Sequence, residues 1–214
     1  YSYKFFRILL IPIIFLADFL QNNFTSFFTP MNMGPVAENS YSLFIKKKIH
    51  KKDFVLDFGS GAGFFSNLFH PNKYLGVEIN ENFVNVSKKR NKKHTFRILK
   101  NDYLKNFERR INLIFINNVL HHLSDDQIFE TFSFFKRKLK NNTKVFIIEP
   151  LFPKSIFTLE FFLKVLDIGN NIKTKKNNIK IFKNIINIER SNIKKVGIGY
   201  VLIVQGRLKN TKSS

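Results

Sequence analysis

The chain has 214 residues, no cysteine and a net charge of +21. Without cysteine it has no disulfide, no thiolate nucleophile and no thiolate metal ligand, and this usage fits a reducing compartment such as the cytoplasm. The length suits one substantial core. Phenylalanine, at 27 residues, is abundant enough to fill it.

An apolar segment, ILLIPIIFLA at 8–17, follows Lys4 and Arg7 near the amino terminus. It is too short to cross a bilayer, which takes about twenty residues. Three alternatives stay open: a lid over a site, a helix lying against a membrane surface, or an ordinary core-packing helix. We therefore expect residues 1–50 to form a helical cap or a membrane-proximal segment.

The stretch VLDFGSGAG at 55–63 is the most informative one. Its first residues read as a strand buried on both faces of a parallel sheet, with Asp57 near the carboxyl end. The three glycines that follow let the backbone turn sharply and approach a ligand at the opening of the next helix. The dinucleotide pattern G-x-G-x-x-G fails, because Phe64 stands where its third glycine belongs. The spacing predicts a cofactor loop of another kind.

With an acid two residues before the first of three alternating glycines, the chain resembles the class I S-adenosylmethionine-dependent methyltransferases. Their first motif is hydrophobic-Asp-x-G-x-G-x-G. The resemblance implies S-adenosylmethionine as the cofactor, and a contact of Asp57 with its ammonium group, directly or through water. The alternative is that Asp57 caps the next helix or satisfies the turn backbone. The turn residues expected to bind the cofactor are Gly59, Ser60, Gly61 and Gly63.

A second apolar run, KYLGVEIN at 73–80, also ends in an acid. Glu78 lies one βαβ step after the glycine turn, where an acid accepts both ribose hydroxyls of a bound nucleoside. This run matches the second motif of the family. We expect Glu78 and the adjacent Ile79 to contact the cofactor.

A third run, FRILKNDYL at 96–104, ends in Asn101 and Asp102. The resemblance places these two residues at the amino group of the cofactor's adenine. Asp102 is explained equally well as the cap of a helical segment that starts at Tyr103.

The fourth run, INLIFINNVLHHLSDD at 111–126, matches the family's motif after its fourth strand. The resemblance implies that the backbone around Asn117 and Asn118 faces the methionine part of the cofactor. A neutral histidine serves as a base near pH 7, so His121 and His122 are the candidates for a general base, although either one can instead be a structural residue that pins the loop.

No His/Asp/Glu cluster has metal-ligand spacing, and the adjacent His121 and His122 are expected to point in different directions, so we predict no metal. Ser124 or Asp125 should cap the next helix. TKVFIIEP at 143–150 supplies a fifth strand.

Beyond this strand, SIFTLEFFLKVLDIGN at 155–170 has a helical apolar pattern. IINIER at 185–190 and VGIGYVLIVQGRL at 196–208 then read as strands. The resemblance implies an α/β fold: a Rossmann-like, doubly wound, seven-stranded sheet, mostly parallel with the last strand antiparallel, and helices on both faces. We expect this domain over residues 51–208, with a disordered tail at 209–214.

The charge invites a nucleic-acid interpretation, but Lys, Asn, Ile and Phe are abundant throughout, so the charge can be compositional. The basic runs at 46–52 and 88–93 are interpreted as solvated helix ends. No proline follows Asn117 and Asn118, which argues against a base methyltransferase of the N6-adenine kind. We predict no specific nucleic-acid partner.

The sequence therefore predicts a methyltransferase that acts on a small-molecule or lipid-like, hydrophobic acceptor by direct in-line displacement. We expect it in the cytoplasm, with a peripheral membrane contact through the amino-terminal segment as an option. Two alternatives stay open. One is an RNA or protein methyltransferase with the same cofactor site, and the other is a non-catalytic subunit of this fold.

Overall fold

The computed structural model describes residues 42, 45, 49–50, 52–100, 103–152, 171–196 and 199–209. Several predictions fall outside these residues. They are most of the amino-terminal segment 1–50, the Asn101–Asp102 pair, the helix expected at 155–170 and the tail after residue 209.

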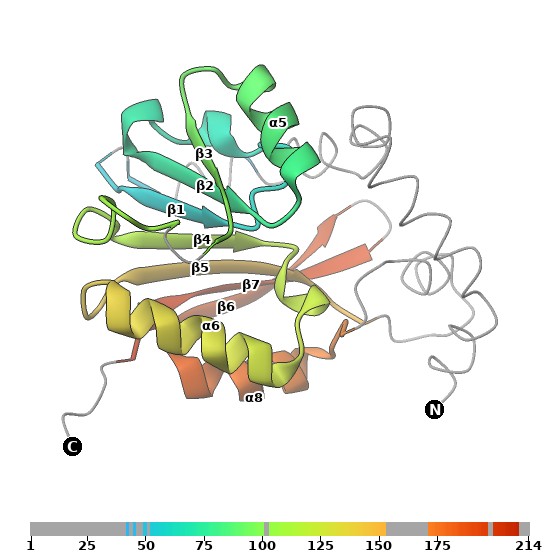
Figure 1. The fold of residues 1–214 in the computed structure, drawn as a ribbon. Coiled ribbons are helices and arrows are strands. Elements are labelled where there is room, and N and C mark those ends of the chain that lie inside the picture. Colours follow the sequence, from blue (N-terminus) through green and yellow to red (C-terminus); the bar gives the residue numbers. More distant parts are fainter. Residues whose placement is uncertain are drawn as a thin grey trace.

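The described residues form one seven-stranded sheet with the order β3-β2-β1-β4-β5-β7-β6 (Figure 1). The first four strands of the sequence are short and largely buried, as the apolar runs predict. The strands in chain order are β1 (Val55–Phe58), β2 (Tyr74–Glu78), β3 (Thr95–Ile98), β4 (Leu113–Asn117), β5 (Lys144–Pro150), β6 (Ile186–Val196) and β7 (Gly199–Leu208).

All strands except β7 run in one direction, because β7 pairs antiparallel with both β5 and β6 while the other pairs are parallel. The strand order reverses at β1, which lies between β2 and β4. In an open α/β sheet, ligands bind outside the carboxyl ends of the strands at such a switch point. The predicted fold, including the antiparallel last strand, is confirmed.

Helices cover both faces of the sheet (Figure 1). α5 (Glu81–Arg90) packs on β2 and β3, and its face of the sheet buries the cluster that includes Val55, Phe69 and Phe96. α6 (Asp125–Lys138) and α8 (Lys175–Ile185) contact each other on the opposite face. Their cluster includes Leu56, Phe135 and Phe182.

The start of α6 follows the sequence prediction. Ser124 is the N-cap, and it forms a capping box in which the Ser124 hydroxyl accepts from the Gln127 N–H while the Gln127 side chain accepts from the Ser124 N–H. The basic run at 88–93 lies at the end of α5, with Lys88, Lys89 and Arg90 in its last turn, as expected for a solvated helix end.

The prediction of a helix directly after the glycine turn is wrong. The chain instead makes two short 3-10 turns, η1 (Ser66–Leu68) and η2 (Pro71–Lys73). Only 15 residues join β1 to β2, the glycine turn uses five of them, and Pro71 would interrupt a helix that continued through it. The cofactor turn is therefore followed by compact turns that pack Phe65 and Phe69 on the sheet.

Two further elements differ from the prediction. β6 extends to Val196, well beyond the predicted strand at 185–190. α8 was not predicted, although its buried residues have helical i, i+3, i+4, i+7 spacing and Thr174 caps it. Lysine and asparagine dominate that helix and weaken its apolar signal. Its buried residues are Asn178, Ile181, Phe182 and Ile185.

Candidate cofactor site

The glycine turn lies at the carboxyl end of β1, in the middle of the sheet. Its three glycines have φ values of 75°, 52° and 74°, in the left-handed region that side chains with a Cβ rarely adopt. The Gly59 and Ser60 N–H groups both donate to Val77 O, at 2.8 and 2.9 Å. A Cβ on Gly59 would lie 2.4 Å from Val119 Cγ2, so this turn packs directly against the exit of β4.

Gly61 and Ser60 give the turn the features of a ligand cradle. A Cβ built on Gly61 meets no atom within 4 Å, so one side of the turn is open space. The Ser60 hydroxyl is buried and has no hydrogen-bond partner among the described residues. A buried polar group without a partner costs free energy, which a ligand atom can recover by bonding to it. The residues present therefore fit a cofactor held against this turn.

Glu78 ends β2 beside the turn. Its Oε2 accepts from the Gly61 N–H at 3.0 Å, and its Oε1 accepts from the Ile79 and Asn80 N–H groups at 2.7 and 3.0 Å. A carboxylate has about four acceptor sites, so this fixed group retains capacity for a ribose hydroxyl. Ile79 beside it is 74% exposed, a large apolar surface at the carboxyl edge of the sheet.

Asp57 lies under the glycine turn and is 3% exposed. Tyr74 Oη donates to Asp57 Oδ2 at 2.6 Å. Burial raises the pKa of Asp57 to about 7, although the Tyr74 hydrogen bond acts in the opposite direction, and the nearby Glu78 charge adds to the rise. Neither of the sequence-based alternatives for Asp57 involved Tyr74. The contact of Asp57 with a cofactor ammonium stays a prediction.

The exit of β4 lies next to the glycine turn, as the Gly59–Val119 approach shows. Asn117 ends the strand, and Asn118 has φ of 55°, a left-handed conformation that asparagine tolerates better than most residues. The Asn118 N–H donates to Ile148 O at 2.8 Å. The structure therefore brings this backbone to the same edge as the glycine turn and Glu78.

Glu149, which the sequence analysis missed, organises the segment after Asn118. This carboxylate is 1% exposed and accepts from three consecutive N–H groups, at 2.9, 2.8 and 3.2 Å. It also lies 2.8 Å from His121 Nδ1. An acid at the end of an apolar run was the available signal, the same one that identified Asp57 and Glu78. The three N–H groups belong to Val119, Leu120 and His121, at the start of η3 (Leu120–His122).

The two candidate bases lie in different surroundings. His121 is buried at 6% exposure and paired with Glu149, whereas His122 is exposed. The expectation that they point in different directions is wrong, because their ring centroids are 4.1 Å apart. The polar cluster at the amino end of the sheet, which includes Asp53 and Asn112, lies away from the carboxyl edge where the candidate site is.

The described residues contain no group of three or more His, Asp or Glu side chains placed to hold a metal ion. No helix in the described part of the chain reaches the length and apolarity that crossing a bilayer requires. Asn101 and Asp102, expected at the adenine, lie outside the described residues.

Comparison with known proteins finds similarity over the part of the chain that contains this candidate site. Residues 56–145 match the family model described as a methyltransferase domain. No curated protein sequence matches the chain.

Among solved structures, a protein of Pyrococcus horikoshii OT3 superposes with a TM-score of 0.61 at 18% identity, over 81% of this chain and 90% of that one. Magnesium protoporphyrin IX methyltransferase of Synechocystis PCC 6803, solved with bound SAH, has a TM-score of 0.58 at 16% identity, over 82% of this chain and 84% of that one. Human N-acetylserotonin methyltransferase, in complex with SAM, has a TM-score of 0.58 at 16% identity, over 82% of this chain and 53% of that one.

The matched region contains β1 to the start of β5, the glycine turn and Glu78, which are the parts from which the site is built. Residues 56–145 are therefore similar to a methyltransferase domain, and the seven-stranded sheet has the fold of the solved methyltransferases named above.

Proposed function

We propose that this protein transfers a methyl group from S-adenosylmethionine to a small hydrophobic molecule by direct in-line displacement. The observation that carries the proposal is the cradle at the switch point: open space at Gly61, the unpartnered Ser60 hydroxyl and the fixed Glu78 carboxylate. When bound, the cofactor supplies a methyl group on a sulfonium, whose bond to sulfur breaks as the acceptor atom attacks. The protein's main contribution is to align the two reactants.

Each residue of the cradle has a role in this proposal. Glu78 accepts hydrogen bonds from the ribose hydroxyls, and Ile79 packs its exposed side chain on the adenine. Ser60 bonds a polar group of the cofactor, and Asn117 and Asn118 line the methionine part with their backbone. The Asp57 carboxylate, under the glycine turn, offsets the positive charge of the cofactor's ammonium group. Asn101 and Asp102 stay predicted contacts of the adenine amino group.

His121 is the better placed of the two candidate bases. An ionised Glu149 only accepts hydrogen bonds, so His121 Nδ1 carries the proton that it donates, and Nε2 then carries the lone pair. A carboxylate that orients a histidine in this way is the arrangement used in general-base catalysis. His122, exposed and with its ring tilted against that of His121, is proposed to shape the loop.

The choice of a small acceptor is supported by two structural neighbours whose names give small ring-containing substrates, magnesium protoporphyrin IX and N-acetylserotonin. The apolar segment at 8–17 supports a hydrophobic acceptor and a peripheral membrane contact. A cytoplasmic location accords with the absence of cysteine.

Calorimetric titration of the purified protein with S-adenosylmethionine, S-adenosylhomocysteine and NADH tests the cofactor. We expect micromolar binding of the first two, about −8 kcal/mol, and none of NADH. Glu78→Ala should weaken binding by about 1–3 kcal/mol because charged hydrogen bonds to the ribose are lost. Glu81→Ala, an exposed acid in the first turn of α5, is the matched control and should bind as the wild type does.

If Glu78→Ala and Glu81→Ala lost the same binding affinity, or if NADH bound instead, the cradle would not be the S-adenosylmethionine site. A protein that binds the cofactor but methylates no candidate from a panel of phenols, quinols and porphyrins, while it methylates RNA or protein, would show that the acceptor class is wrong.

A further inference from the structure

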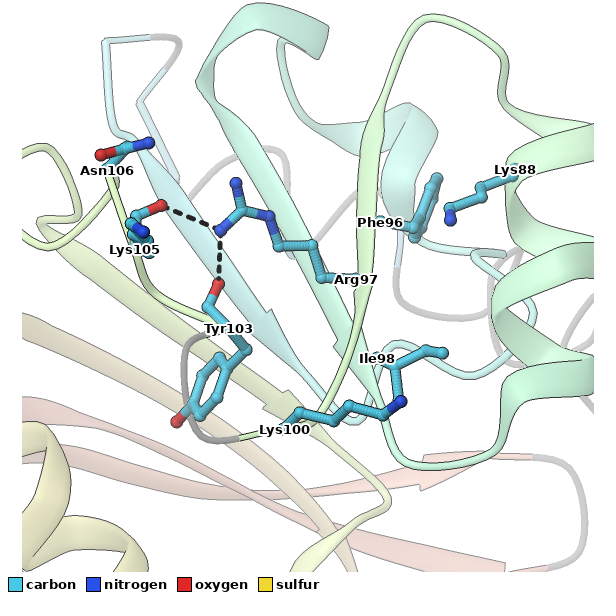
Figure 2. A pocket seen from close by; sticks show the side chains of 8 residues that line it. All are labelled: Lys88, Phe96, Arg97, Ile98, Lys100, Tyr103, Lys105 and Asn106. Carbon is cyan, nitrogen blue, oxygen red and sulfur yellow. Dashed lines mark hydrogen bonds between the residues drawn. The ribbon is translucent and has the colours of Figure 1, made fainter.

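A basic groove runs along the outer edge of β3, beside the cradle. It has a volume of about 460 Å³ and is lined by residues from the end of α5, from β3 and from the turn that follows (Figure 2). Four of its eight lining residues are cationic and none is acidic. We call this surface the β3 groove; its cationic residues are Lys88, Arg97, Lys100 and Lys105.

Arg97 is held in place at the centre of the groove. Its Nη1 donates to the carbonyl oxygens of Tyr103 and Lys105, at 3.0 and 2.9 Å (Figure 2). Its guanidinium also lies 4.7 Å from the centre of the Phe107 ring. These bonds use one nitrogen, and the guanidinium has donors on two more. A planar guanidinium fixed in this way loses little side-chain freedom when it binds an oxyanion.

The three lysines of the groove are exposed, and none is in an ion pair with a described residue. An exposed lysine without an ion pair to a described residue is available to bind an anionic partner. Each lysine comes from a different piece of the chain: Lys88 from α5, Lys100 from the end of β3, and Lys105 from the turn beyond it.

Composition alone does not explain this concentration of charge. Residues 88–110 contain ten Lys or Arg among 23 residues, whereas the whole chain has 36 among 214. The local density is therefore more than twice the mean. Three of these residues, Lys88, Lys89 and Arg90, lie in the last turn of α5, where Lys88 lines the groove.

The β3 groove adjoins the cradle without being part of it. Ile98, which lines the groove, is the strand neighbour of Glu78. Phe96, which lies on the same face of β3 and also lines the groove, has its ring 3.0 Å from the position of a Cβ on Gly63. A partner held in the groove would therefore sit beside the carboxyl edge of the sheet.

We propose that the β3 groove binds the phosphodiester backbone of a single-stranded nucleic acid. A row of cations in a groove fits a flexible chain that carries one charge per nucleotide. Phe96 and Tyr103 are buried, so they offer no stacking platform, and binding should depend little on base sequence. The proposal is independent of which acceptor the enzyme methylates.

Fluorescence anisotropy with a fluorescein-labelled 20-nucleotide single-stranded RNA of mixed sequence, without cofactor, tests the proposal. The test variant is Lys88→Gln/Lys100→Gln/Lys105→Gln, which leaves Arg97 to hold the turn. The matched control removes the same charge from exposed lysines of α8, on the other side of the sheet from α5: Lys175→Gln/Lys176→Gln/Lys183→Gln. Thermal unfolding of both variants checks that each is folded.

We expect the groove variant to bind RNA at least tenfold more weakly than the α8 variant. The slope of log affinity against log salt should fall in magnitude by about 2, because each lost phosphate contact of a single strand contributes about 0.7. Equal losses in the two variants would mean that net charge alone attracts RNA, and would overturn the proposal. Polyglutamate that competes as well as unlabelled RNA, or groove-dependent binding to phosphatidylserine vesicles but not to RNA, would also overturn it.

Discussion

At the scale of single residues, burial of Asp57 raises its pKa and so makes protein stability depend on pH. Asp57 lies within the sheet, its pKa is raised from 3.8 to about 7 by burial, and Tyr74 donates to it. Between about pH 4 and 7 the folded protein therefore retains a proton that the unfolded chain has released. The free energy of unfolding must fall as the pH rises through this window and become constant above it.

Asp57→Asn removes this dependence, so the variant should gain stability relative to wild type between pH 4.5 and 8. The shift of about 3 pKa units sets an upper bound of about 4 kcal/mol on that gain. Urea unfolding at the two pH values measures it. Asp126→Asn, an exposed acid in the first turn of α6, serves as the control. A wild-type-to-variant difference that does not change with pH would contradict the assigned pKa.

Glu149 makes a second residue-scale prediction. Glutamine in its place has one acceptor oxygen and presents an NH₂ group to backbone donors that the carboxylate now satisfies. Glu149→Gln should therefore lower stability by about 2–3 kcal/mol and weaken binding of S-adenosylhomocysteine, because the β4 exit loses its anchor. Thermal unfolding and calorimetry measure both, with the exposed Glu130→Gln as control. If Glu149→Gln were destabilised but bound S-adenosylhomocysteine as the wild type does, Glu149 would contribute to stability alone.

At the scale of elements, the glycine turn separates a packing role from a binding role. Both Gly59 and Gly61 have positive φ, yet only Gly59 is packed, against Val119. Gly61→Ala should cost about 1–2 kcal/mol for the left-handed backbone and lower cofactor affinity at least tenfold, because its methyl enters the cradle. Calorimetry and thermal unfolding test this change.

Gly59→Ala should be more destabilising than Gly61→Ala, because its methyl collides with Val119 as well. Val119→Ala removes the colliding atoms, so the double variant Gly59→Ala/Val119→Ala should recover part of the lost melting temperature. If Val119→Ala lowers the melting temperature of the Gly59→Ala variant further, the collision with Val119 is not the cause of its instability.

At the scale of the whole molecule, a buried polar network lies at the opposite end of the sheet from the candidate cofactor site. Asp53, 3% exposed near the amino end of β1, accepts from Lys144 Nζ at 3.0 Å, from Asn112 Nδ2 at 3.3 Å and from the His50 N–H at 3.1 Å. These contacts join β1, β4 and β5 across up to 91 residues of sequence. They involve no residue of the cradle.

Asp53→Ala should therefore lower stability by about 2 kcal/mol, or about 4–8 °C in melting temperature, and leave cofactor affinity unchanged. The partly exposed Lys144 limits the loss, because water can solvate it. Glu189→Ala breaks the exposed pair with Arg207 and should cost at most about 1 kcal/mol. Comparable losses in both variants, or weakened cofactor binding by Asp53→Ala, would count against this separation.

Sequence patterns located the strands and the order of their functional ends, and they limited the cap of α6 to Ser124 or Asp125. These features are local: an apolar run, an acid at its end, alternating glycines, and a capping residue before a helix. Each pattern lies within about ten residues, so short-range sterics and hydrogen bonding express it directly. The glycine turn and Glu78 could therefore be found as a candidate site, and the fold followed from the family resemblance.

The contacts between side chains across the sheet became apparent only in the folded structure. Tyr74 lies 17 residues from Asp57 and Glu149 lies 28 residues from His121, and each pair forms because neighbouring strands bring the two side chains together. The compact turns after Gly63, the full length of β6 and the helix α8 depend on packing that no short window contains. Burial and pairing are properties of the assembled sheet, which is why the pKa of Asp57 and the anchor of the β4 exit could not be read from the sequence.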